Sequence, residues 1–193
     1  MATKELIVVR GANGAGKTTF ANEYVVGSGR AFLSADAIAE QMSPSDPARS
    51  RTAASREFLR QIRTAINGDD SFVVESTLSG RTFQHVLTKA RVARYKIKIA
   101  YLFLHSDDEC VERVRLRVQK GGHDVPEVDV RRRFTRSLWN FWNLYRELAD
   151  SWALMYNSGI EPQEVAIGTA DQFSIGDPEL FFRFQRLMEP RRR

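Results

Sequence analysis

The stretch "ELIVVRGANGAGKTTF", residues 5–20, decides how the rest of the chain is interpreted. It begins with a short apolar run, which is typical of a buried strand. A glycine-rich turn follows, and its "GANGAGKT" matches the spacing G-x-x-x-x-G-K-[ST] in full. Glycines permit positive φ angles and close backbone approach, so successive N–H groups can point at phosphate oxygens. The sequence therefore predicts a phosphate-binding loop (P-loop) between a strand and a helix, whose N-terminus also favours an anion.

Each residue of this loop has an expected contact. We expect Lys17 to place a positive charge on the β- and γ-phosphates and the Thr18 hydroxyl to bind Mg²⁺. The chain contains neither an N-K-x-D segment nor a D-x-x-G switch, so a GTPase switch is not expected. ATP and Mg²⁺ are thus the predicted cofactors. The predicted ATP-binding residues are Gly11, Ala12, Asn13, Gly14, Ala15, Gly16, Lys17, Thr18 and Thr19.

Composition sets limits on the class of protein. With 193 residues, 42% hydrophobic and 27% charged, the chain is expected to form one domain, residues 1–193, of ordinary globular type. One cysteine, Cys110, excludes an internal disulfide and a cysteine-based metal site, and three dispersed histidines indicate no other metal site. No apolar run approaches a membrane span and no signal-peptide pattern begins the chain. We therefore expect a cytoplasmic location and no membrane partner.

Apolar runs alternate with helical patterns along the chain. This alternation predicts an α/β fold, a P-loop NTPase three-layer sandwich with a mainly parallel five-stranded sheet, of the nucleoside-monophosphate-kinase type. A helical lid is expected at about 113–136 and a C-terminal helical extension at about 170–193. Strands are expected at 5–10, 31–34, 71–75, 97–104 and 152–157, with a short edge strand at 165–167. Helices are expected at 17–26, 47–66, 81–94, 108–120, 127–149 and 178–188.

Two acids stand at predicted strand ends, where open α/β sheets bind ligands. Asp36 follows the second strand and Glu75 ends the third. A carboxylate that accepts the proton of a substrate hydroxyl suits phosphoryl transfer to an alcohol, and the other acid suits a metal or substrate ligand. The alternatives are a helix N-cap for Asp36 and a solvated strand end for Glu75. Thr77, two residues after Glu75, is expected to share its direction and bind the substrate.

Positive charge is concentrated in one segment. Residues 113–136 hold eight Arg and Lys against three acids. The net charge of this segment alone is therefore +5, the same as that of the whole chain. Helical spacing places Arg113, Arg117 and Lys120 on one flank of the first helix. It places Arg133, Ser137 and Asn140 together on the second. The pattern predicts an arginine clamp on the triphosphate, and the alternative is a charged, solvated surface.

Four segments in order resemble the zeta-toxin-like P-loop kinases. They are "GANGAGKTT" (11–19), "LSAD" (33–36), "VVESTLSG" (73–80) and "VERVRLRVQKGGHDVPEVDVRRRFTRSLWNFW" (111–142), and the resemblance covers about residues 5–157. It implies phosphorylation of a hydroxyl on the amino sugar of UDP-N-acetylglucosamine, with Asp36 as base. It also implies that Glu75 and Thr77 contact the substrate and that Arg113 binds phosphate. The lid segment is typical of a compact non-toxin branch, in which Arg117, Arg132 and Arg133 are candidates for the lid arginine.

The predicted function is therefore an ATP- and Mg²⁺-dependent kinase acting on a small-molecule hydroxyl. The resemblance implies that this small molecule is a nucleotide sugar. An antitoxin partner is expected only for a true toxin. One alternative is a polynucleotide 5′-hydroxyl kinase, which the basic segment and the tail Arg191–Arg193 favour. The other is a non-catalytic ATP-binding or ATPase module, which leaves Asp36 and Glu75 without a role.

Overall fold

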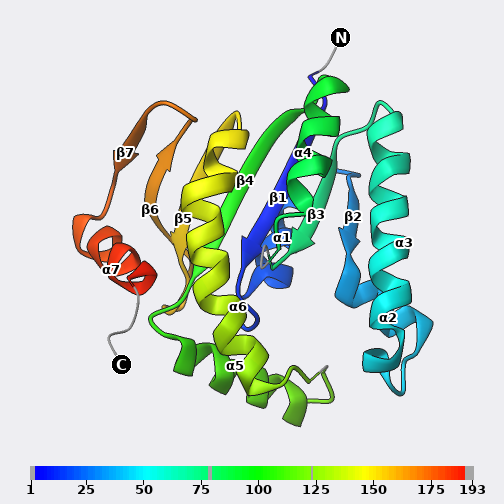
Figure 1. Ribbon diagram of the computed structural model, residues 1–193, viewed down its shortest axis with the longest axis horizontal. Coiled ribbons are helices and arrows are strands. Elements are labelled where there is room, and N and C mark those ends of the chain that lie inside the picture. Colours follow the sequence, from blue (N-terminus) through cyan, green and yellow to red (C-terminus); the bar gives the residue numbers. More distant parts are fainter. Residues whose placement is uncertain (1–2, 78–79, 123, 190–193) are drawn as a thin grey trace.

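Seven strands form one sheet in the order β2-β3-β1-β4-β5-β6-β7 (Figure 1). The computed structural model describes residues 3–77, 80–122 and 124–189; His123 and Arg191–Arg193 lie outside this part of the chain. The strands from β2 to β5 are parallel, and β6 and β7 add to them antiparallel. The strands are β1 Glu5–Gly11, β2 Ala31–Ser34, β3 Phe72–Ser76, β4 Lys96–Phe103, β5 Ser151–Tyr156, β6 Gln163–Gly168 and β7 Phe173–Ile175.

The sheet differs from the prediction at its C-terminal edge. Five strands are parallel as expected, but the sheet has seven, and the segment expected to be a helical extension begins with β7. All three residues of β7 are exposed, so this strand lacks the buried apolar run by which a strand is recognised. The predicted edge strand is β6, which is paired on both sides.

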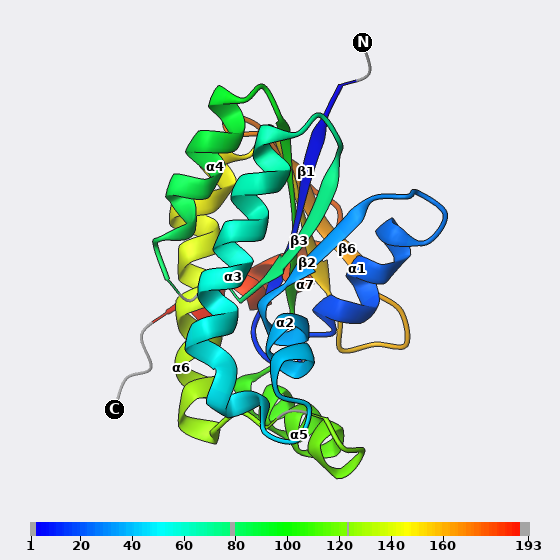
Figure 2. The ribbon, with the colours of Figure 1, turned by 90° about the vertical axis from the view of Figure 1, so that its right-hand side faces the viewer.

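Helices cover both faces of the sheet. In Figure 2, α1 lies on one face and α3, α4 and α6 lie on the other, which confirms the predicted three layers. In Figure 1, α5 lies across the carboxyl ends of the strands, at the bottom of the view. The helices are α1 Lys17–Val25, α2 Ala35–Met42, α3 Pro47–Asn67, α4 Phe83–Val92, α5 Asp107–Gln119, α6 Glu127–Asn140 and α7 Pro178–Met188. None of the described helices is long and apolar enough to cross a membrane.

Two helical features were not predicted. Helix α2 starts directly after β2 without a loop, so its eight residues show no separate periodic pattern. The helix expected over 127–149 ends at Asn140 and continues as a π-helix, Phe141–Tyr145, and a 3₁₀ turn, Arg146–Leu148. A π turn has one more residue than an α turn, and the spacing of apolar residues alone did not distinguish the two. Tyr145 in this turn is buried, and its hydroxyl donates to Gly80 O at 2.7 Å.

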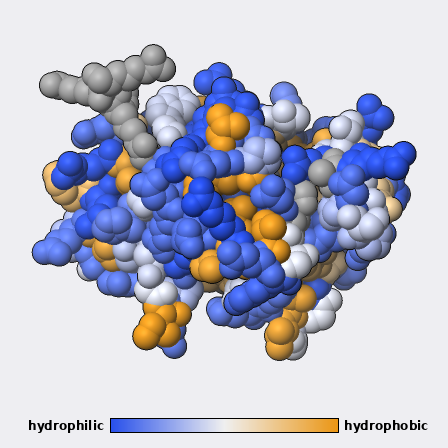
Figure 3. All heavy atoms as spheres, turned by 90° about the horizontal axis from the view of Figure 1, so that it is seen from below, coloured by the Kyte–Doolittle hydropathy of each residue, from blue (hydrophilic) through white to orange (hydrophobic). Residues whose placement is uncertain are grey.

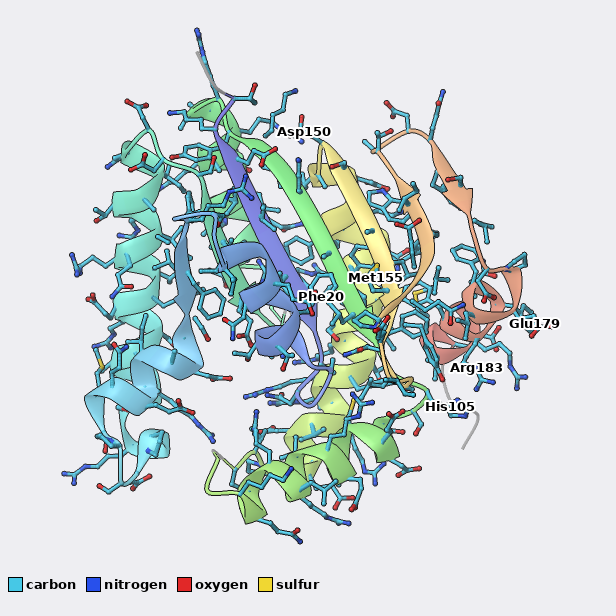
Figure 4. The ribbon with its side chains drawn as sticks, turned by 180° about the vertical axis from the view of Figure 1, so that it is seen from behind. Phe20, His105, Asp150, Met155, Glu179 and Arg183 are labelled. Atoms are coloured by element: carbon cyan, nitrogen blue, oxygen red, sulfur yellow. The ribbon has the colours of Figure 1, made fainter. Side chains whose placement is uncertain are left out.

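An aromatic cluster fixes the C-terminal part to the sheet. Phe184 of α7 is fully buried among the rings of Phe103, Phe141 and Trp142, with centroid distances of 5.3, 6.3 and 5.6 Å. A polar contact adds to it: Arg183 Nη1 donates to His105 Nε2 at 2.9 Å, and Figure 4 shows these two residues close together beside α7. The last helix is thereby anchored beside the carboxyl end of β4.

Candidate functional site: the phosphate loop and its cavity

Three glycines give the loop after β1 its shape. Gly11, Gly14 and Gly16 have φ values of 150°, 82° and 81°, in the region that favours glycine. A Cβ at each would lie less than 3.0 Å from another group: the backbone oxygens of Leu102 and Cys110, and the side-chain nitrogen of Asn157. The loop therefore has the backbone conformation and close packing expected of a phosphate-binding loop.

Lys17, Thr18 and Glu75 form a connected group at the mouth of this loop. Lys17 Nζ donates to Ala12 O at 2.9 Å and lies 3.8 Å from Glu75 Oε1. The Thr18 hydroxyl donates to Glu75 Oε2 at 2.8 Å. Parallel pairing of β3 with β1 brings Glu75 there, opposite Val9. Glu75 is only 5% exposed, so its alternative reading as a solvated strand end is wrong.

The residues present fit ATP phosphates and Mg²⁺. Backbone N–H groups of the glycine loop and the N-terminus of α1 suit an anion, and Lys17 adds a charge. The hydroxyl of Thr18 and the carboxylate of Glu75 are hard oxygen ligands of the kind Mg²⁺ prefers. Among the described residues, no three His, Cys, Asp or Glu side chains cluster, so Mg²⁺ would keep water and phosphate ligands, as it usually does.

A cavity of about 490 Å³ opens next to this group. It brings together Lys17, Asp36, Glu75, Thr77 and Arg133, five of the predicted site residues. Asp36 is exposed in the first turn of α2, where Ser34 is the N-cap, so the N-cap reading of Asp36 is wrong. Figure 3 views this end of the molecule, which is largely hydrophilic with apolar side chains visible between polar ones.

One wall of the cavity was not predicted and belongs to α3. Polar side chains lie nearer the start of this helix and apolar ones further along it. Their spacing, i, i+1, i+4, i+7, i+8, is that of one helix face. This spacing could have indicated that one face of the helix changes from polar to apolar along its length and lines a site. The α3 residues in the wall are Arg51, Thr52, Ser55, Phe58 and Leu59.

The predicted arginines Arg113, Arg117 and Arg133 occupy two different places. Arg133 lines the cavity, and its Nη1 donates to Asn13 Oδ1 of the loop at 3.2 Å. Arg113 Nη2 donates to Asn157 O and pairs with Glu109, both at 2.8 Å. Arg113 and Arg117 together line a separate surface hollow with Lys120. The arginines thus flank both the loop and the cavity, and only Arg133 touches both.

Two predicted neighbours of Arg133 face the core instead. Ser137 is buried with its oxygen 2.7 Å from Tyr101 Oη, and Asn140 is also buried. The lid nevertheless reaches the cavity, because Val125 forms part of its wall. Arg51 Nη2 of α3 also donates to Asp124 O, at 3.0 Å, which joins the lid loop to the opposite side.

Support behind the loop comes from Asn157 and Cys110. Asn157 Nδ2 donates to Ala15 O at 2.8 Å, a contact that no local pattern signals because 142 residues separate the partners. Cys110 is fully buried beneath Gly14, and burial raises the pKa of its thiol to about 12. A thiol in this state is a packing residue, as its apolar helical spacing suggests.

The fold and the site define a P-loop kinase-like domain. The chain belongs to the AAA_33 family, described as an AAA domain, whose model matches residues 6–137. By sequence it is also similar to an uncharacterized protein of Haemophilus influenzae, with 27% identity over 124 residues that cover 64% of this chain and 88% of the relative.

Solved structures share the fold at low sequence identity. One is AvrRxo1-ORF1:-ORF2 with ATP, at TM-score 0.77 and 17% identity over 100% of this chain, which spans 65% of that one. A second, from the PezAT toxin–antitoxin system of Streptococcus pneumoniae, has TM-score 0.61 and 12% identity, covering 98% and 89%. A gluconokinase from Sinorhizobium meliloti has TM-score 0.53 and 18% identity, covering 82% and 86%. These similarities show an α/β P-loop kinase fold with a mostly parallel sheet.

Proposed function

We propose that this protein is an ATP- and Mg²⁺-dependent kinase that transfers the γ-phosphoryl group to a hydroxyl of a small molecule. The observation that carries the proposal is the cavity beside the P-loop, which has Lys17 at one side and the exposed carboxylate of Asp36 in its wall. A volume of about 490 Å³ suits a small molecule. The arrangement thus offers a donor side and an acceptor side that share Lys17 and Glu75.

On the donor side, the glycine loop and Lys17 hold the phosphates, while Thr18 and Glu75 hold Mg²⁺. Mg²⁺, when bound, neutralises charge on the β- and γ-phosphates. Arg133 bonds Asn13 and lines the cavity, so it is placed to stabilise negative charge on the transferred group. Arg113, which donates to Asn157 O behind the loop, and Arg117, which lines a hollow with it, are proposed to bind the nucleotide.

On the acceptor side, Asp36 is the proposed general base and Thr77 a proposed substrate contact. The acceptor oxygen forms a bond to the γ-phosphorus as the bond to the β,γ-bridging oxygen breaks. The acceptor proton passes to the Asp36 carboxylate, and ADP leaves with the electron pair. Catalysis in this scheme is mainly positioning and charge stabilisation.

For the acceptor itself, we favour a nucleotide sugar such as UDP-N-acetylglucosamine. The zeta-toxin-like motifs support this choice, as does the shared fold with a protein of the PezAT toxin–antitoxin system. The compact lid segment supports a non-toxin role, in which no antitoxin partner is required.

The test compares Asp36→Asn with Glu40→Gln, a matched change on the same helix outside the cavity. Single-turnover transfer of labelled γ-phosphate to a pool of nucleotide sugars and oligonucleotides is measured together with ATP affinity. We expect Asp36→Asn to lower transfer by roughly 10²–10⁴-fold, the usual contribution of a general base, while ATP affinity stays within error. Full transfer by Asp36→Asn refutes the base assignment. Labelled oligonucleotides indicate the polynucleotide kinase, and no labelled product indicates the ATP-binding module.

A further inference from the structure

Arg10, the next-to-last residue of β1, has a fully buried side chain. Its Nε, Nη1 and Nη2 make no hydrogen bond to any residue that the structure describes. Burial lowers the pKa of the guanidinium to about 9. Buried arginines are normally paired, and nearly all buried polar groups have a partner. This cation in the middle strand of the parallel region therefore calls for an explanation.

The neighbours of Arg10 belong to the wall of the acceptor cavity. Its Cζ lies 3.7 Å from the ring centroid of Phe83, which lines the cavity. Parallel pairing sets Arg10 opposite Ser76, another lining residue. The acid that precedes Ser76 in β3 is Glu75. Its carboxylate already contacts Lys17 and accepts a hydrogen bond from Thr18. Arg10 thus stands behind residues of the cavity wall: the ring of Phe83 covers its guanidinium, while Glu75 and Tyr145 raise its pKa by charge interaction without a hydrogen bond to it.

This arrangement is costly if Arg10 serves the fold alone. A ring contact compensates only part of the hydration that a buried guanidinium loses. An apolar side chain of similar length beside Phe83 and Tyr145 would avoid that loss, and such replacements are often neutral or stabilising. Residues that break a packing rule in this way are concentrated at functional sites.

We propose that Arg10 binds an anionic group of the phosphoryl acceptor, a phosphate or a carboxylate, which reaches the guanidinium by displacing the ring of Phe83. The inference rests on the proposed kinase function and narrows its acceptor to anionic hydroxyl compounds. The planar guanidinium suits bidentate binding of either oxyanion. Asp36 and Lys17 line the same cavity as Phe83, so one anchor would orient the acceptor hydroxyl toward them.

The test measures binding separately from transfer. Protein saturated with Mg²⁺ and ADP is titrated calorimetrically with glucose, gluconate and glucose 6-phosphate, and with uridine and uridine 5′-monophosphate. We expect the wild type to bind an anionic member of a set about 10–100-fold more tightly than its neutral counterpart, as for a charge-assisted hydrogen bond. Gluconate against glucose 6-phosphate distinguishes a carboxylate from a phosphate.

Arg10→Met is expected to lose this preference while its melting temperature stays equal to or above that of the wild type. Arg10→Lys retains the positive charge but cannot bind an oxyanion in the bidentate manner of a guanidinium, so it should keep part of the preference for the anionic compound. This variant takes the place of Arg10→Met if Arg10→Met does not fold. Arg63→Met, at an exposed arginine of α3, is the control and should keep the full preference. No preference in the wild type, or an undiminished one in both Arg10 variants, overturns the inference. Failure of transfer to every compound with the binding preference intact counts instead against the proposed function.

Discussion

The two halves of the sheet are filled with different kinds of side chain. In the half formed by β2, β3 and β1, polar and charged groups are buried at the carboxyl ends, among them Arg10, Lys17 and Glu75. In the half from β5 to β7 with α7, the corresponding space holds rings, including Trp142, Trp152 and Phe184. Buried charge costs stability unless it is well paired and hydrogen-bonded, whereas buried rings add to stability. The comparison predicts that substitutions in the first half alter chemistry and those in the second alter folding.

The largest effect is expected from Phe184→Ala in the aromatic half. Removing a fully buried ring leaves a cavity and should lower the free energy of unfolding by about 3–5 kcal/mol. Urea unfolding measures this loss. Phe182→Ala on the same helix is the control, because Phe182 is 61% exposed and its loss should change stability by less than about 0.5 kcal/mol. Equal losses in both variants would show that the cluster does not hold α7.

Lys17→Met should give the next largest effect. It removes the charge placed at the phosphates, and loss of one such group typically costs roughly 10²–10³-fold in rate. The measurement is single-turnover phosphoryl transfer, with circular dichroism to confirm the fold. Lys89→Met, at an exposed lysine of α4, should transfer at the wild-type rate. If Lys17→Met retains more than a tenth of the rate, the loop does not serve as the donor site.

A smaller effect is expected when Glu75 loses its charge. Glu75→Gln can still accept the hydrogen bond of Thr18 but no longer offers an anionic oxygen to Mg²⁺. We expect the Mg²⁺ concentration for half-maximal activity to rise by about 10–100-fold, the range seen when the surroundings of a metal are altered. Glu179→Gln on α7, at the far edge of the sheet in Figure 4, is the control. An unchanged Mg²⁺ dependence would confine Glu75 to the substrate-binding role that the sequence suggested.

The two halves also differ in how much the sequence revealed. The phosphate loop was predictable because eight consecutive residues specify its backbone, and the parallel strands because both faces are covered and their apolar runs are continuous. Helix α2 and strand β7 were missed because one follows a strand without a break and the other is exposed throughout.

The site shows the same division. Asp36, Glu75 and Thr77 were predicted because they end strands, and they do line one cavity. Arg10 was read only as the end of a strand, because nothing local distinguishes a buried arginine from one that reaches solvent. Its condition depends on Phe83 of α4 and Tyr145 of the π turn, 73 and 135 residues away. A sequence motif covers only neighbouring residues, so it cannot reveal contacts between residues this far apart in the chain.

The smallest effect is expected at the boundary of the two halves, from Tyr101→Phe in β4. Tyr101 pairs with Arg10 across the strands and stacks on Phe141 with centroids 4.4 Å apart, so it touches both kinds of core. Its hydroxyl lies 2.7 Å from Ser137 Oγ, and Ser137 keeps a bond to Phe134 O when that hydroxyl is removed. The free energy of unfolding should therefore fall by only about 0.5–1.5 kcal/mol, the net value of one hydrogen bond. Phosphoryl transfer, measured on the same preparation, should stay at the wild-type rate, because the ring and its stacking are retained. If phosphoryl transfer falls while stability does not, β4 belongs with β2, β3 and β1 to the half of the sheet that serves the chemistry.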